Sequence, residues 1–281
     1  MRRKAYVGIA AAAAILICAA VLIHMVRAQS FMAEAGRMAE SLLAEKLGTA
    51  VHIGAVEIRS LHELALDDVV IYDKQAEAVL RADEARVTLR LLSLLSTPET
   101  SIDEILLTGA HVDVVRRADG SWNYDDIGVD DGKPSSFEGR IRLADATANV
   151  DVDGRSYDLS AITGTVDIDR SDVSYDLTGA LSGVPLRVRG AYVGGTQELD
   201  LSASDTDGMP LLKYLPESSL PEEIHVDTLH ADRVHMEMRR VDGVATFDGH
   251  VDGVRGTADV YGTRVQLESA ALRFNEREVF L

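Results

Sequence analysis

The feature that most constrains this chain is a two-residue alternation of apolar and polar side chains, which begins near Val51 and recurs through later segments. Val56 and Ile58, for example, alternate with Glu57 and Arg59. Successive side chains of a strand point to opposite faces, so such segments form strands with one apolar face and one solvated face. This pattern is typical of antiparallel sheets and predicts a mostly β protein.

Turn signals separate the alternating segments. Asp-Gly pairs are the strongest two-residue hairpin signal, and they occur at Asp119-Gly120, Asp153-Gly154, Asp242-Gly243 and Asp252-Gly253. Two apolar runs followed by proline, 90–96 and 208–215, predict short helical interruptions. No Cys–Trp–Cys spacing indicates a compact sandwich.

A weak internal repeat indicates how the sheet is built. Leu143-Ala144-Asp145 resembles His230-Ala231-Asp232, at an offset of about 87 residues. A repeated β unit is typical of an elongated sheet that grows by addition of strands. Because the sequence stops at 279–281 in an apolar strand start, we expect it to be the front portion of a longer molecule.

The N-terminus predicts the topology. Between Lys4 and Arg27 lie 22 residues without a formal charge, long enough as a helix to cross a hydrocarbon core of roughly 30 Å. The basic residues at 2–4 should stay cytoplasmic, so residues from about 30 onward are exported. The alternative is a signal peptide cleaved after Ala28, although the apolar run is longer than the usual h-region of about 7–15 residues.

The remaining organisation follows from periodicity and composition. A helical stripe with spacings of three and four precedes the strands, and it consists of Phe31, Ala35, Met38 and Leu42. The predicted parts are a tail and transmembrane anchor (1–29), a connector helix (30–48), a first β unit (49–127), a polar linker (128–136) and further β units truncated at the C-terminus (137–281).

Charge excludes one class of function. The formal net charge is −18, and the part after residue 29 carries −22 because the first 29 residues hold four basic side chains and no acids. A body with this negative charge repels nucleic-acid phosphates and anionic lipid headgroups. We therefore expect no nucleic-acid partner. The single cysteine, Cys18, excludes a disulfide framework and a cysteine-based metal site within one chain.

No pattern of catalytic chemistry emerges. Paired carboxylates lie in polar turns or on solvated faces, where their acidity stays ordinary; they are Asp125/Asp126, Asp130/Asp131 and Asp151/Asp153. The segment 151–154 lacks the third ligand and closing glutamate of a calcium loop. None of the eight histidines forms an HExxH or i, i+4 pair, and no nucleophile elbow or phosphate loop is present. We expect no enzyme, metal or cofactor.

Ordered motifs over residues 1–127 resemble the N-terminal region of the AsmA-like and TamB-like envelope proteins. After an anchor and short helix come a strand start, an L-x-L-x-D-V-x-V-x-D block, an Ala-Asp pair, a leucine-rich helix and R-x-x-D-G-x-W-N. In this chain the blocks are Gly48–Gly54, Leu64–Asp73, Ala82-Asp83, 91–95 and Arg116 or Arg117 to Asn123. Ala50 departs from the family, which often has proline there. We expect Trp122 to cap the sheet end by burying its ring, with Asn123 supporting the turn.

The resemblance implies an elongated, curved antiparallel sheet that forms a repeating β-groove, an open trough between inner and outer membrane. It also implies a role in phospholipid transport or in outer-membrane protein assembly. The leading hypothesis is therefore an inner-membrane protein with a periplasmic body, whose groove binds phospholipid acyl chains. The alternatives are a scaffold for outer-membrane β-barrel proteins, whose assembly partner would bind a missing C-terminal part, and a passive surface or adhesion protein. The candidate groove residues are Val112, Val114, Ile141, Leu143, Val150, Val152, Leu186 and Val188.

Overall fold

The computed structural model describes residues 36–275 and 279–280, apart from 38, 42, 46, 61, 91–101, 128–137, 170–171, 215–222 and 243. The predicted anchor at 1–29 and the predicted linker at 128–136 lie outside this part. Within it, no helix has the length and apolar character needed to cross a bilayer. The boundaries proposed for the β units and linker therefore stay predictions.

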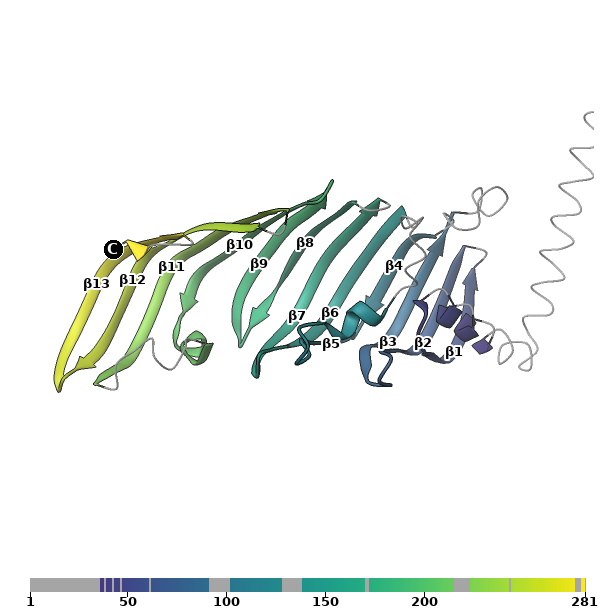
Figure 1. The fold of residues 1–281 in the computed structure, drawn as a ribbon, viewed down its shortest axis with the longest axis horizontal. Coiled ribbons are helices and arrows are strands. Elements are labelled where there is room, and N and C mark those ends of the chain that lie inside the picture. The colour runs from purple at the N-terminus through teal and green to yellow at the C-terminus, as the bar shows by residue number, and fades with distance from the viewer. Residues whose placement is uncertain are drawn as a thin grey trace, which may run out of the picture.

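The described chain is mostly β, and all its strands belong to one long, curved sheet (Figure 1). Two 3-10 helices, η2 (Asn123–Asp126) and η3 (Met209–Tyr214), interrupt it. The second of them confirms the helical interruption predicted at 208–215. The strands are β1 (Val51–Ser60), β2 (Glu63–Tyr72), β3 (Ala78–Leu89), β4 (Ile102–Thr108), β5 (His111–Val115), β6 (Glu138–Val152), β7 (Arg155–Asp169), β8 (Asp172–Leu181), β9 (Val184–Val193), β10 (Thr196–Asp207), β11 (Ile224–Val241), β12 (Val244–Val260), β13 (Thr263–Asn275) and β14 (Val279–Phe280).

The expected antiparallel sheet is in fact mixed. Strands β4 and β5 run as one interrupted strand beside β3, and both pair with β6 in parallel, as in Ile105 with Ile141 and Val114 with Val150. A parallel pair needs a crossover connection, which the segment between Val115 and Glu138 supplies. Alternation gives no information on strand direction, so the prediction of a wholly antiparallel sheet was wrong at this one junction.

The sheet forms a single layer. Each strand makes its extensive contacts only with the strands to which it is hydrogen-bonded, and no strand packs face to face on another in the described chain. One helix, within residues 36–47, contacts the sheet at its N-terminal end. Its Ala39 and Leu43 pack on a buried cluster that includes Ile53, and Glu40 accepts a hydrogen bond from the Ile53 amide at 2.7 Å. The four predicted stripe residues of this helix lie outside the described part.

A row of left-handed residues crosses the middle of the sheet. Such residues have positive φ inside or between strands: Asp68 in β2, Gly109 between β4 and β5, Asp145 in β6, Ala161 in β7, Asp205 in β10 and Gly253 in β12. The pairing register brings them into line, because Gly109 lies opposite both Asp83 and Asp145. We call this row of bulges the crease.

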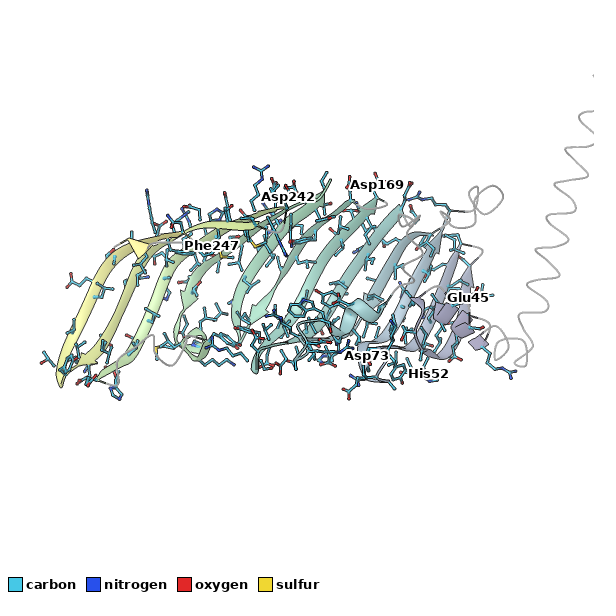
Figure 2. The ribbon with its side chains drawn as sticks, in the orientation of Figure 1. Glu45, His52, Asp73, Asp169, Asp242 and Phe247 are labelled. Carbon is cyan, nitrogen blue, oxygen red and sulfur yellow. The ribbon has the colours of Figure 1, made fainter. Side chains whose placement is uncertain are left out.

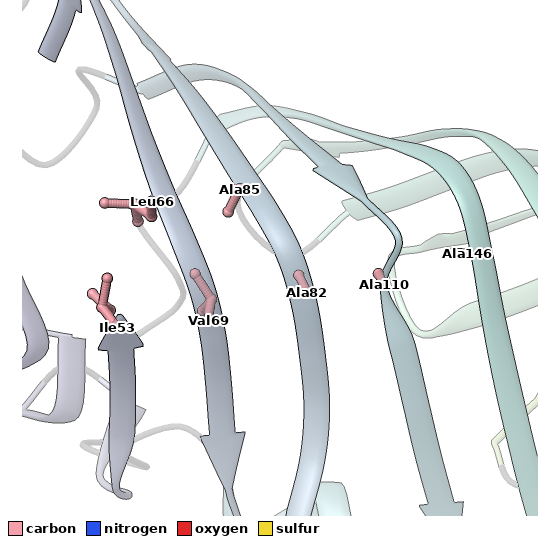
Figure 3. Close-up of a cluster of buried hydrophobic side chains, with 7 residues drawn as sticks. All are labelled: Ile53, Leu66, Val69, Ala82, Ala85, Ala110 and Ala146. Carbon is pink, nitrogen blue, oxygen red and sulfur yellow. The ribbon is translucent and has the colours of Figure 1, made fainter. Parts of the chain in front are cut away.

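The crease bends the strands toward the apolar side of the sheet. Leu66 and Val69 belong to one buried cluster although three positions separate them, so the two residues between them both point outward. An additional outward residue lengthens the outer side of the strand, and the strand curves away from it. On the inner side of the bend, the small residues Ala82, Ala110 and Ala146 are buried in the same cluster as Leu66 and Val69 (Figure 3).

The Asp-Gly pairs have two different roles. Asp153-Gly154 forms the predicted two-residue hairpin, with positive φ at both positions, and Asp242 begins the turn between β11 and β12. Asp252-Gly253 was predicted as a hairpin, but it lies inside β12 as part of the crease. Turns at 182–183, 194–195 and 261–262 were missed because serine, glycine and tyrosine replace the aspartate.

The crease can be tested at Gly109, whose φ is +59° and whose added Cβ would overlap the Asp83 carboxylate. Left-handed backbone alone costs about 1–2 kcal/mol for a residue with a Cβ. We expect Gly109→Ala to lower the free energy of unfolding by about 2–3 kcal/mol. In an Asp83→Ala background the same change should cost only about 1 kcal/mol. Urea unfolding followed by circular dichroism measures both; equal costs would show that Asp83 does not crowd this position.

Candidate functional site

All eight candidate residues lie on one face of the sheet. The register pairs them with each other or with further apolar residues: Val112 with Leu80 and Ala148, Val114 with Val150, Ile141 with Ile105 and Val166, Leu143 with Leu107, Leu186 with Gly179, and Val188 with Leu177 and Leu201. Val152 follows Val150 at the same parity and pairs with Arg155. We call this side the apolar face.

The apolar face continues beyond the candidates to both ends of the sheet. On β11 and β12 it carries Met236, Met238 and Phe247, which lie across from Leu201, Leu199 and Met238 respectively. Aromatic rings cover two of its glycines: an added Cβ at Gly249 would meet the Phe274 ring, and one at Gly190 would meet Tyr175. No aspartate or glutamate of the described strands shares this face by register. The acids are confined to the opposite side and to the rims.

The apolar face is half-exposed along most of its length. All eight candidates are intermediate in burial, neither buried nor fully exposed. At the C-terminal end exposure increases, with Phe247, Val265 and Leu267 among the exposed large hydrophobic residues. Large buried side chains occur mainly beside the helix at 36–47, as Ile53 and Leu66 do. Farther along, Tyr214 of η3 stacks on Tyr157, which lies across from Val150, with a centroid distance of 4.7 Å. In the described chain, no second layer of strands lies over the face.

The opposite face is a lattice of exposed ion pairs between neighbouring strands. Asp176 on β8 accepts hydrogen bonds from the Arg187 guanidinium of β9, with an Nε–Oδ1 distance of 2.8 Å. These hydrogen bonds, together with the charges of Arg187 and Arg189, lower the pKa of Asp176 below its ordinary value. Arg140 and Asp167 form a similar pair between β6 and β7 at 2.7 Å. The two faces therefore differ completely in polarity.

The ion pair of Asp176 predicts a pH dependence. Because its pKa is lower in the folded protein, the stabilisation is present above the ordinary carboxyl pKa of 3.8 and is lost as the pH falls through the folded value. Asp176→Asn should lower the Tm at pH 7 only slightly, by about 1–2 °C, since the pair is exposed. The difference between variant and wild type should shrink and then disappear as the melts are run at progressively lower pH, below the ordinary carboxyl pKa of 3.8. A difference that persists there would assign the effect to packing.

Two of the family-like motifs, the block that ends at Asp73 and the segment Arg117–Asn123, meet in a structural cluster at the rim where Asp73 lies (Figure 2). The Asp73 carboxylate is 4% exposed, accepts the amides of Gln75 and Glu77, and pairs with Arg117 at 2.9 Å. Asn123 is buried and holds β5 in place: its side chain accepts the Val115 amide and donates to a backbone carbonyl. These residues therefore fasten the β2–β3 turn to the end of β5.

Trp122 differs from its predicted role. Its ring is only half-buried and stacks on Tyr124 with a centroid distance of 5.7 Å, while its amide donates to Asp125. The buried anchor of this motif is Asn123 instead, because its amide side chain satisfies two backbone groups of β5.

The cluster can be tested by replacing two adjacent arginines, one with a buried partner and one with an exposed partner. Arg117→Ala leaves the buried Asp73 carboxylate without its cation, and we expect it to lower the free energy of unfolding by about 2–4 kcal/mol. Arg116→Ala removes an exposed pair with Asp153, at 3.2 Å, and should cost less than about 0.5 kcal/mol. Urea unfolding compares the two variants. Equal losses would contradict a role for the buried pair.

The described carboxylates among those singled out in the sequence do not converge on one site. Asp125 caps η2, Asp153 pairs with Arg116, and Asp151 lies in β6 with its backbone carbonyl bonded to the Arg116 amide. The side chain of Asp126 and residues 130–131 lie outside the described part.

One cluster was missed because only the register reveals it. On the ion-paired face, His235 lies between Asp200, 3.6 Å from Nδ1, and Glu237, 3.1 Å from Nε2. Among the described residues, these three are the group whose ligand-type atoms come close enough to hold a metal ion, within 4.8 Å of one another. In the sequence, the histidines would stand out as metal ligands only through HExxH or i, i+4 spacing. Those spacings describe one helix and do not reveal ligands on neighbouring strands.

No protein-family model and no curated protein matches this sequence.

Proposed function

We propose that this protein is a non-enzymatic envelope protein that binds phospholipid acyl chains along its apolar face and so moves lipid between membranes. In this proposal the bent sheet acts as an open groove, with the crease as its floor and the strand ends as its rims. Residues 1–29 anchor it in the inner membrane, and the sheet lies in the periplasm.

The observation that carries the proposal is a continuous, half-exposed apolar face without acidic residues. A monomeric protein rarely leaves so long an apolar surface uncovered, and such surfaces are typical of binding sites. Acyl chains suit this face because each methylene removed from water contributes roughly 0.8 kcal/mol, and the contact needs no specific polar partner. The resemblance to AsmA-like and TamB-like proteins points to the same cargo and remains a hypothesis.

Two alternatives give different outcomes in one experiment. Purifying the full chain in mild detergent and analysing it by mass spectrometry should reveal co-purifying phospholipid. Lipid-free protein that captures unfolded β-barrel segments would instead favour the assembly scaffold. Lipid-free protein that captures nothing would favour a passive surface or adhesion protein.

The groove is tested by placing a charge on its wall. Val150→Asp should leave the melting temperature within about 3 °C of wild type, because water reaches the half-exposed position and hydrates the carboxylate. Bound lipid should nevertheless decrease several-fold, since acyl chains would have to pass a hydrated charge. Asn149→Asp is the matched control: it adds the same charge on the same strand, but on the opposite face. Lipid loss in both variants, or unfolding of Val150→Asp, would contradict an open groove.

A further inference from the structure

The apolar face carries only two charged side chains among the described strands, and both are arginines. Arg240 lies opposite Gln197 and Ala245, and Arg155 lies opposite Val152. Both belong to this face because the register places them in line with its apolar residues. In a body as acidic as this one, the absence of carboxylates and the presence of two cations on one face is a marked asymmetry.

Both arginines lie at a rim. Arg240 is the second-last residue of β11, beside the turn that begins at Asp242, and Figure 2 places Asp242 along the rim that also carries Asp169. Arg155 is the first residue of β7, directly after the Asp153-Gly154 turn. The strand interiors between the rims and the crease carry no charge on this side.

Both arginines also have guanidinium N–H groups that are available to bind a ligand. Arg240 is exposed and makes no ion pair with another described residue, whereas its neighbour Arg239 points to the other face and pairs with Glu198 at 3.6 Å. Arg155 is exposed too, and its Nη1 donates a long hydrogen bond of 3.4 Å to the Tyr214 carbonyl. A guanidinium has five N–H donors, so most of those on each arginine stay free for a ligand.

The spacing between rim and crease is somewhat longer than one acyl chain. Arg240 is seven residues from Arg233 at the crease, and Arg155 is six residues from Ala161. At about 3.3 Å per residue, both distances along the strand are roughly 20 Å. The hydrocarbon of one bilayer leaflet is about 15 Å thick, half of the membrane core. A chain that starts at the rim therefore reaches close to the crease.

We propose that Arg240 and Arg155 bind the phosphate of a glycerophospholipid headgroup at the two rims of the groove, so that the acyl chains point toward the crease. This inference rests on the proposed lipid-binding function and assigns its polar contacts. Guanidinium suits a phosphate because it can donate two parallel hydrogen bonds to it. The chain's charge favours a zwitterionic headgroup over an anionic one, since a body of −22 repels a net negative lipid. Asp242, two residues from Arg240, offers a carboxylate to the headgroup amine.

The test uses the full chain in mild detergent and vesicles that contain acyl-labelled phosphatidylethanolamine or acyl-labelled diacylglycerol. The two lipids share their chains, but only the first has a phosphate. We expect wild type to load more phosphatidylethanolamine than diacylglycerol. Arg240→Ala and Arg155→Ala should each reduce that preference about fivefold or less, as exposed charge contacts do, and the double variant should abolish it. Loading of diacylglycerol should stay unchanged in every variant.

Arg239→Ala is the matched control, because it removes an arginine from the adjacent position on the opposite face. An equal reduction in this variant would assign the effect to net charge and overturn the inference. Diacylglycerol loading without any preference for the phosphate-bearing lipid would overturn it as well, while leaving the acyl-chain groove intact. If wild type loads neither lipid, the proposed function itself fails.

Discussion

The structure depends on the bulges of the crease, each of which shifts the alternation of inward and outward side chains by one residue. We call this shift a slip. At the crease two consecutive residues point outward, and a left-handed backbone accommodates the additional one, as at Asp68, Asp145 and Gly253. Without the slip, the apolar face would lie on a flat or simply twisted sheet. With it, neighbouring strands bend at the same height, so the apolar residues above and below the crease face a common space. Alanine at Ala82 and Ala110 then fills the narrow inner side.

The slip also explains which parts of the fold could be predicted. Local alternation shows which residues share a face, and the eight candidates do share one. The direction of β6 could not be found in this way, because alternation looks the same in parallel and antiparallel strands. Asp252-Gly253 was misassigned since an Asp-Gly pair favours left-handed backbone in a hairpin and in a bulge alike. The Ala-Asp repeat at 144–145 and 231–232 was noticed in the sequence, but its meaning, a shared position in the crease, required the register.

The candidate site was predictable in its apolar part and not in its polar part. Val150 and Val188 stand out by pattern, whereas Arg240 looks like any charged residue near a turn until pairing places it beside Gln197 and Ala245. Composition gave no information on this point either. The net charge of −18 does not show that the acids of the described strands are confined to one face and the rims. A total charge cannot describe a molecule whose two sides are so different.

The single-layer arrangement, in which each described strand makes its extensive contacts only with its hydrogen-bonded neighbours, has a consequence for how such a protein changes in evolution. A hairpin inserted or deleted would alter only two interfaces and would preserve strand direction, provided that its bulges align with the crease. At about 4.8 Å between strands, the thirteen-strand path spans roughly 60 Å, and each hairpin adds about 10 Å. The length of the sheet can therefore change in steps of two strands, and no hydrophobic core between layers has to be repacked.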